Sequence, residues 1–448
     1  MQTPIVDFLQ HYAAADPARF HMPGHKGHAF LGCEPLDLTE IPGADSLYEA
    51  NGIIAESEAH ASALYGSQRT CYSTEGSSQC IRAMLYLALQ HDSGSGRPMI
   101  AAARNAHRSF LYAAALLDFD ILWLWPEESH SLCHCPISPG SLEQTLSRLP
   151  VPPAAVYLTS PDYLGGMADL SALAEICHRH DTLLLVDNAH GAYLHFLSPS
   201  LHPLDLGADL CCDSAHKTLP VLTGGAYLHV SRRMPSCIAQ QAKNALALFG
   251  STSPSYLTLA SLDLCNRYLD SGYPSRLAET TERLHLLRQQ LLANGWRTEV
   301  SDPLRLVIRA PEGSSGLAEA QRLASQGIYC EYADRDVFVL MATPENSIQQ
   351  LQQLKTALGK APSDPVSFPR LPLPYASAAI SVRQALFSPS ETIPVEDALG
   401  RVCGAPVVSC PPAIPIAVSG EYITQEALTL FRYYGISTIE VLQQKLQR

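Results

Sequence analysis

A lysine and an aspartate each follow an apolar segment that has the character of a buried strand. Asp187 comes directly after residues 183–186, and Lys217 comes shortly after residues 208–212. Their spacing of 30 positions leaves room for one crossover connection between parallel strands. Because burial and nearby positive charge disfavour the ammonium form, a lysine in such a crevice becomes a better nucleophile. A carboxylate at the neighbouring strand end can hold a protonated ring nitrogen.

Lysine for a Schiff base and a carboxylate for a pyridinium nitrogen are the groups that pyridoxal phosphate requires from a protein. Each residue also has an ordinary explanation, because a lysine after a strand is usually solvated and an aspartate there often caps a helix. Here, however, Ser214 and His216 stand beside Lys217 in the sequence, and Asp187 follows the preceding predicted strand. This combination favours the cofactor, and we predict a pyridoxal-phosphate enzyme.

The segment Thr-Glu-Gly-Ser-Ser, residues 74–78, separates a predicted strand from a predicted helix. Glycine allows a tight turn, and the free N–H groups at a helix N-terminus can bind an anion. With its two serine hydroxyls this loop is a candidate phosphate site, although taken alone it is better explained as an ordinary helix cap. The Walker A pattern GxxxxGK[ST] is missing, which disfavours a nucleoside triphosphate.

His107 follows another predicted strand, and its flat ring could stack on a flat cofactor. A hydrogen-bonded structural histidine is the usual explanation for such a residue on its own. All these loops, however, follow the carboxyl ends of predicted strands, which is where open α/β sheets bind ligands. That convergence is the main argument from the residues themselves.

A second cluster, His130, Cys133, His134 and Cys135, consists of zinc-ligand residue types. Three ligands at consecutive positions cannot easily close one tetrahedral site, and no second CxxC or HxxxH pair accompanies them. We therefore predict no metal site. The sequence also lacks the GxSxG motif of serine hydrolases and the GxGxxG motif of dinucleotide-binding proteins.

The composition is that of an ordinary globular protein, since 46% of the 448 residues are hydrophobic and 16% are charged. A formal net charge of −13 disfavours nucleic acid or an anionic membrane as a partner. The sequence shows no signal peptide and no apolar stretch of the roughly 18 residues that a membrane span needs. The 13 cysteines follow no framework spacing, so we predict reduced thiols in a cytoplasmic protein.

Short strand-like segments alternate with segments of helical periodicity between about residues 55 and 230. The predicted strands include residues 69–74, 119–125, 154–159, 183–186, 208–212 and 225–230. This alternation predicts an α/β fold, with a mostly parallel sheet sandwiched by helices. Further along, helices at 277–294, 317–325 and 348–358 and strands at 304–308 and 337–341 predict a smaller α+β C-terminal domain. The proline-rich residues 361–374 have the composition of a linker.

Several motifs together resemble the Orn/Lys/Arg decarboxylase family, which has the aminotransferase-like fold called fold type I. They are FHMPGHKG (20–27), DLTE (37–40), NAH (105–107), TSPDYLG (159–165), DNAHGA (187–192), SAHKT (214–218), STSPSY (251–256) and the tail 411–421. The chain resembles the shorter form of the family, without a receiver-like domain. The resemblance implies an N-terminal arm (1–50), a pyridoxal-phosphate-binding major domain (51–265), a small α+β domain (266–365) and the family's C-terminal region (366–448).

By this resemblance Lys217 would form the Schiff base, Asp187 would face the pyridine nitrogen, His107 would stack on the ring and His190 would lie beside the cofactor. The phosphate would be surrounded by Gly76, Ser77, Ser78, Ser214 and His216. Ser251 and Thr252 would complete that site from the neighbouring subunit, which implies a homodimer with shared active sites. Glu421 matches a family position near the substrate.

The resemblance implies decarboxylation of a basic amino acid, arginine or lysine before ornithine, to an amine of polyamine metabolism. Another α-carbon reaction, such as transamination or β-elimination, and a non-catalytic cofactor-binding paralogue remain alternatives. The chain departs from the family pattern at five positions: Glu75, Asp162, Asn188, Ala413 and Ser419. The family usually has a neutral residue at position 162, where an extra carboxylate could face a cationic substrate, although a helix cap or a solvated loop residue is the simpler explanation. At position 188 the family motif is DEAHGA rather than DNAHGA.

Overall fold

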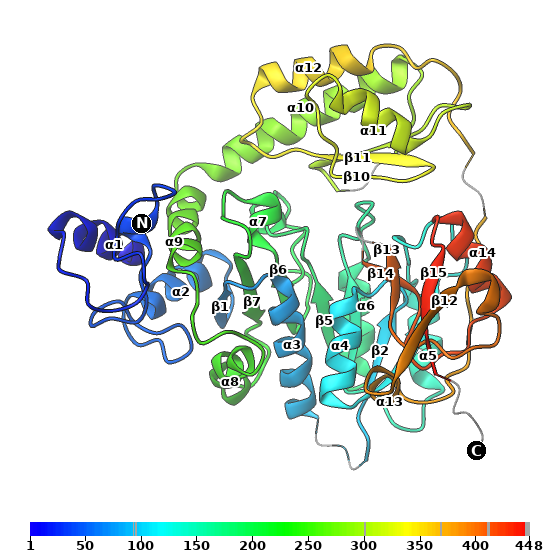
Figure 1. Ribbon diagram of the computed structural model, residues 1–448, viewed down its shortest axis with the longest axis horizontal. Helices are drawn as coiled ribbons and strands as arrows, with labels where there is room; N and C mark the ends of the chain where they lie inside the picture. The colour runs from blue at the N-terminus through cyan, green and yellow to red at the C-terminus, as the bar shows by residue number, and fades with distance from the viewer. Residues whose placement is uncertain (93, 95, 300–301, 368–369, 410–412, 444–448) are drawn as a thin grey trace. The chain divides into compact units, whose positions relative to one another are not determined.

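The computed structural model describes residues 1–92, 94, 96–299, 302–367, 370–409 and 413–443 (Figure 1). The chain forms two compact units. The first comprises Met1–Gly94, Ala154–Leu158 and Leu170–Ala278, and the second comprises Ser95–Pro153, Thr159–Asp169 and Glu279–Arg448. Among the described residues, no helix combines the length and the apolar character that a membrane crossing requires.

The first unit is built on neighbouring strands in the order β1-β7-β6-β5-β4. Their bounds are β1 Arg69–Ser73, β4 Ala155–Thr159, β5 Leu183–Asp187, β6 Leu210–Asp213 and β7 Ala226–Val230. Strands β5 and β6 are parallel, whereas β7 runs antiparallel to both of its neighbours. Nearly every side chain of these strands is buried, which explains why the sequence shows continuous apolar segments rather than alternation.

Helices of the first unit pack on this sheet and on one another. They are α1 Pro4–Ala15, α2 Ile53–Leu64, α3 Ser77–His91, α6 Leu170–Arg179, α7 Ala215–Thr218, α8 Ser236–Ala247 and α9 Tyr256–Asp270, with the 3-10 turns η1 Glu34–Leu36 and η2 Leu194–Phe196. Helix α3 packs against β5, β6, β7 and α8, so its first turn is fixed by the sheet. The start of α1 is fixed by Asp263, whose carboxylate accepts the backbone N–H groups of Ile5 and Val6 at 2.9 and 3.1 Å.

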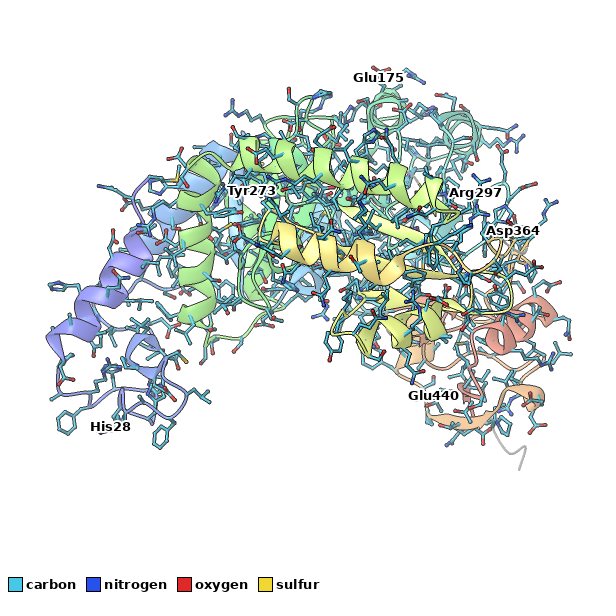
Figure 2. All side chains as sticks on the ribbon, turned by 90° about the horizontal axis from the view of Figure 1, so that it is seen from above. His28, Glu175, Tyr273, Arg297, Asp364 and Glu440 are labelled. Carbon is cyan, nitrogen blue, oxygen red and sulfur yellow. The ribbon has the colours of Figure 1, made fainter. Side chains whose placement is uncertain are left out.

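The second unit contains the parallel pair β2 (Met99–Ala103) and β3 (Asp120–Leu124), connected by α4 (Arg108–Leu117), and then α5 (Pro139–Ser147). It also contains an antiparallel sheet in the order β10-β11-β9-β8 with three helices. These elements are α10 Tyr273–Ala293, β8 Thr298–Glu299, β9 Arg305–Arg309, α11 Gly316–Ala324, β10 Tyr332–Ala333, β11 Val337–Met341 and α12 Ile348–Leu358. Helix α10 begins in the first unit at Tyr273, labelled in Figure 2.

The C-terminal part of the second unit has a small core of its own, with Val395, Ile416, Phe431 and Val441 among its buried residues. Its elements are α13 Val382–Leu386, β12 Ser390–Pro394, η3 Val395–Asp397, β13 Val407–Ser409, β14 Ile414–Ala417, α14 Gln425–Tyr433 and β15 Thr438–Leu442. Strand β12 pairs with β15, and β13 pairs with β14. Of the tail motif, residues 411 and 412 lie outside the described residues.

The predicted α/β class and the smaller α+β sheet are confirmed, with ends displaced by a few residues. The helix predicted at 277–294 begins earlier, at Tyr273, and the strand predicted at 208–212 forms at Leu210–Asp213. Residues 16–52, most of the predicted arm, contain only η1 among regular elements, and four large apolar side chains there are exposed. They are Phe20, Met22, Phe30 and Leu31. The division into four segments stays a prediction.

A buried ion pair in the first unit leads to a stability prediction. Lys243 Nζ lies 2.5 Å from Glu58 Oε1, and the two side chains are 5% and 6% exposed. Burial raises the pKa of Glu58, while Lys243 opposes that shift. Replacing Lys243 with methionine leaves an unpaired buried carboxylate, and we expect the free energy of unfolding to fall by about 3–5 kcal/mol. Urea unfolding measures this.

The exposed pair of Arg283 and Glu279, 3.0 Å apart, is the matched control, because we expect Arg283→Ala to cost at most about 0.5 kcal/mol. The double variant K243M/E58Q should recover part of the loss, since it removes the unpaired charge. Equal effects of K243M and R283A would contradict a role for burial in this ion pair.

Candidate active site

The predicted lysine and histidine lie together in the first unit. Lys217 is half-buried in the one-turn helix α7, directly after β6, and His190 lies in the loop after β5. Lys217 Nζ is 3.1 Å from His190 Nε2, so the two groups can exchange a proton. Two loops that follow parallel neighbouring strands therefore bring an amine and an imidazole into contact.

Asp187 ends β5 with its side chain buried, at 3% exposure. Its Oδ2 accepts the Tyr157 hydroxyl at 3.0 Å, and its Oδ1 accepts the Ala189 N–H at 3.2 Å. Burial raises the pKa of Asp187, and the positive charge of Lys217 is the largest effect opposing it. A cation bound at this carboxylate would hold it ionised. Tyr157 was not predicted, although a tyrosine in the apolar segment AVYLT was a visible signal.

The predicted phosphate loop forms a helix N-terminus. Gly76, at φ +72°, precedes the first residue of α3, and this positive φ explains the need for glycine. Ser214 Oγ donates to Ser77 Oγ at 2.9 Å, which joins the loop after β6 to the first turn of α3. The N–H groups of that turn and the two hydroxyls form the kind of cradle that binds an anion.

The other residues of the first unit that were predicted to bind the cofactor differ in burial. His216 Nδ1 bonds to the Gly225 carbonyl at 3.0 Å, and burial lowers the pKa of His216. Ser251 and Thr252 are both exposed. The Ser251 N–H donates to the Glu75 carboxylate of the same chain. Glu75, one of the positions that differ from the family motif, thus has a hydrogen-bond partner in its own chain. The contribution of Ser251 and Thr252 to a second subunit stays a prediction.

His107 and Asp162 belong to the second unit. His107 is the N-cap of α4, and its Nδ1 accepts the Ser109 N–H at 3.2 Å. Asp162 is buried, with Oδ1 accepting the N–H groups of Leu164 and Gly166 at 2.9 and 2.7 Å. Its Oδ2 lies 2.5 Å from His134 Nδ1, and this hydrogen bond raises the pKa of His134. The Asp162 carboxylate therefore stabilises a turn and a histidine.

Glu421, also in the second unit, has a buried arginine as its partner. Arg104 Nη2 lies 3.6 Å from Glu421 Oε2, and each side chain is 7% exposed. The Arg104 guanidinium also donates to the carbonyls of Pro415 and Ile416 at 2.7 and 2.9 Å. Burial raises the pKa of Glu421, and Arg104 opposes that shift. Sequence reasoning missed Arg104, whose only signal was a single arginine after the apolar residues 99–103.

The site residues thus fall into two sets. Lys217, His190, Asp187 and the phosphate loop meet within the first unit, and Arg104 with Glu421 within the second. The predicted stacking of His107 and the substrate contacts of Asp162 and Glu421 stay predictions. What the first set offers chemically is a nucleophilic amine, a proton-exchanging imidazole, a buried carboxylate and an anion cradle.

The chain is similar to known amino-acid decarboxylases over most of its length. The chain is 30% identical to an arginine decarboxylase of Halalkalibacterium halodurans, over 96% of this chain and 93% of that protein. An arginine decarboxylase of Bacillus subtilis is 29% identical, over 96% and 92% of the two chains.

Among solved structures, lysine decarboxylase LdcF of Francisella novicida superposes with a TM-score of 0.81 at 16% identity, covering 98% of this chain and 81% of that one. An alanine–glyoxylate aminotransferase from Nostoc sp. superposes with a TM-score of 0.55 at 17% identity, covering 68% and 85%. These likenesses show an aminotransferase-like fold. The major-domain model of Orn/Lys/Arg decarboxylases matches residues 3–311 and their C-terminal-domain model matches residues 366–445, so the chain belongs to the Orn/Lys/Arg decarboxylase family.

Proposed function

We propose that this protein binds pyridoxal phosphate and decarboxylates a basic amino acid, with arginine or lysine as a better substrate than ornithine. The observation that supports this most is the contact between Lys217 Nζ and His190 Nε2 at 3.1 Å, in the same unit as the buried Asp187. Membership of the Orn/Lys/Arg decarboxylase family favours decarboxylation among the reactions that these three groups could perform. The relatives named arginine decarboxylase support the basic substrate class.

The residues present fit the cofactor by their chemistry. The first turn of α3, with Ser77 and Ser214, suits a phosphate dianion. The buried Asp187 carboxylate suits a protonated ring nitrogen, and Lys217 Nζ suits the aldehyde carbon.

When bound, pyridoxal phosphate supplies an electron sink for the electron pair left at the substrate α-carbon after CO₂ departs. Asp187 would hold the ring nitrogen in its protonated form, which makes this sink effective, because an ionised carboxylate raises the pKa of a neighbouring nitrogen. Lys217 Nζ would hold the aldehyde carbon of the cofactor, and as a free amine it could return a proton to the substrate α-carbon. His190 Nε2, in contact with Nζ, can resupply that proton.

Three further features belong to the proposal: a homodimer with shared active sites, to which Ser251 and Thr252 contribute across subunits, a cytoplasmic location, and a role in polyamine metabolism. Arg104 would hold Glu421 in place for the cationic end of a substrate. Glu421 accepts the Val418 N–H at 3.0 Å, so its carboxylate is oriented from two sides.

The test is to incubate the purified holoenzyme with arginine, lysine, ornithine, glutamate and an aromatic amino acid. We expect CO₂ release and an amine of matching mass from arginine or lysine, with less from ornithine. Keto-acid formation without CO₂ would favour transamination instead. Turnover of non-basic amino acids only would contradict the substrate class, and bound cofactor without any turnover would indicate a non-catalytic paralogue.

A further inference from the structure

A buried carboxylate at the end of β6 holds three side chains of the first unit. Asp213 Oδ1 accepts the Asn188 amide at 2.7 Å, and Oδ2 accepts His202 Nε2 and His229 Nε2 at 3.1 and 3.2 Å. All four side chains are 0% exposed. Burial alone would raise the pKa of Asp213, but the two histidines outweigh it and lower the pKa well below its usual range. Asp213 is therefore an anion in the interior.

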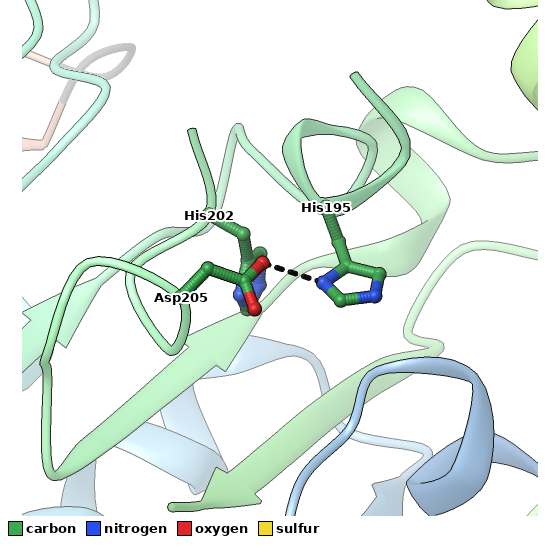
Figure 3. A group of neighbouring side chains, drawn as sticks. All are labelled: His195, His202 and Asp205. Atoms are coloured by element: carbon green, nitrogen blue, oxygen red, sulfur yellow. Dashed lines mark hydrogen bonds and ion pairs between the residues drawn. The ribbon is translucent and has the colours of Figure 1, made fainter. Parts of the chain in front are cut away.

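The histidines connect Asp213 to further polar groups. His229 Nδ1 bonds to Thr70 Oγ1 at 2.8 Å, and His202 Nδ1 accepts the Leu204 N–H at 3.3 Å. Beside His202, His195 Nδ1 pairs with an Asp205 carboxylate oxygen at 2.7 Å (Figure 3). The residue types of this group could ligate a metal, but both ring nitrogens of His202 already have protein partners. The arrangement is better explained as a hydrogen-bonded support for Asp213.

Asn188 links this anion to the proposed cofactor site. It follows Asp187 directly, and its backbone N–H donates to the Cys212 carbonyl of β6 at 3.0 Å. Asp213 in turn precedes Ser214, which contacts the phosphate loop, and lies four residues before Lys217. The side-chain bond between Asn188 and Asp213 therefore joins the loop that carries Asp187 and His190 to the loop that carries Lys217.

The charge of Asp213 explains the residue at position 188. A carboxylate acceptor requires a donor opposite it, and a glutamate, as in the DEAHGA form of the motif, would place two buried anions together. The amide is also closely enclosed, because a Cβ on Gly191 would lie 2.0 Å from Asn188 Oδ1. Asparagine at this position is thus matched to aspartate at position 213.

We propose that Asn188 and Asp213 form a positioning pair, which sets Asp187 and Lys217 in register for the cofactor. This inference rests on the proposed function. Asn188 acts through the loop of Asp187, and Asp213 through the loop of Lys217.

The test is a charge swap on the holoenzyme. Asn188→Asp puts two carboxylates in contact, and we expect the affinity for pyridoxal phosphate and kcat each to fall on the order of tenfold or more. The double variant N188D/D213N restores a donor and an acceptor, because the amide at position 213 can donate to the new carboxylate while its oxygen accepts both histidines. We expect it to return both quantities to within about threefold of the parent. Cofactor affinity is measured by absorbance titration of the cofactor-free protein.

Asn266→Asp is the matched control. Asn266 is equally buried, and its amide donates to the Tyr72 hydroxyl at 2.7 Å and the Ser57 carbonyl at 3.0 Å, which belong to β1 and α2 rather than to either loop. It should lower the melting temperature and leave cofactor affinity and kcat per folded molecule unchanged. If N188D also changes only the melting temperature, or if the swap fails to rescue, the positioning pair is overturned.

A parent protein that takes up no pyridoxal phosphate would instead refute the proposed function. Thermal unfolding of four proteins, the parent, the single variants N188D and D213N, and the double variant N188D/D213N, would then still decide whether positions 188 and 213 are coupled. Additive changes in stability would show that they are not.

Discussion

Lys217→Ala is expected to reduce decarboxylation by at least about a thousandfold, the largest effect of any single replacement in this protein. The alanine variant has no amine to form the covalent link with the aldehyde and none to return a proton to the α-carbon. The anion cradle at Ser77 and the Asp187 carboxylate are untouched, so cofactor should still bind without a covalent link. Turnover is measured as CO₂ released per bound cofactor.

Borohydride reduction followed by peptide mass analysis gives an independent measurement. In the parent protein we expect the reduced cofactor on the peptide that contains Lys217, and in the variant on no peptide. Lys360, which is exposed after α12, supplies the control, since Lys360→Ala should change neither result. Labelling of another lysine in the parent protein, or full activity of the Lys217 variant, would refute the assignment.

Asp187→Asn should have the second largest effect, a loss in kcat on the order of a hundredfold or more, because under the proposed function it removes the charge that would keep the ring nitrogen protonated. The amide has nearly the same shape, and its oxygen can still accept the Tyr157 hydroxyl, which lies 3.0 Å from Oδ2. Covalent attachment at Lys217 should therefore persist. Comparing kcat with the extent of borohydride labelling separates the two effects, and loss of labelling together with activity would mean that Asp187 is needed for folding or binding instead.

The same substitution should stabilise the protein when cofactor is removed. Burial raises the pKa of Asp187 above its ordinary 3.8, despite the opposing charge of Lys217. A carboxyl with a higher pKa in the folded than in the unfolded chain binds protons preferentially in the folded state, so stability is lost as the pH rises from 3.8 through the raised value. The amide does not titrate and escapes that loss.

We therefore expect cofactor-free Asp187→Asn to melt at a higher temperature than cofactor-free parent protein at pH 7, with the difference shrinking as the pH falls toward the ordinary pKa. Differential scanning fluorimetry from pH 5 to pH 8 would show it. A lower melting temperature for the variant throughout this range would mean that the surroundings of Asp187 favour the ionised form.

Local signals in the sequence determined the class of the fold and pointed to the two central residues of the proposed site. Strands such as the one at residues 183–186 are covered on both faces of the sheet, so their sequences are continuously apolar and can be recognised. The residues that follow such segments, Asp187 and Lys217 among them, are placed at strand ends by chain connectivity alone. Helix ends differed from the prediction, as the early start of α10 at Tyr273 shows, because tertiary packing decides where a helix begins.

Only the tertiary structure decided which polar side chains are partners. Glu421 meets Arg104 from more than 300 residues away, and Asp187 meets Tyr157 from a different strand. Asn188 and Asp213 each had an ordinary explanation in the sequence, and their bond exists because β5 and β6 lie side by side. Hydrogen bonds and ion pairs depend on distances of about 3 Å, which no spacing along a chain can specify. The sequence thus determined the residue types of the site, while packing of distant segments determined their partners, burial and charge.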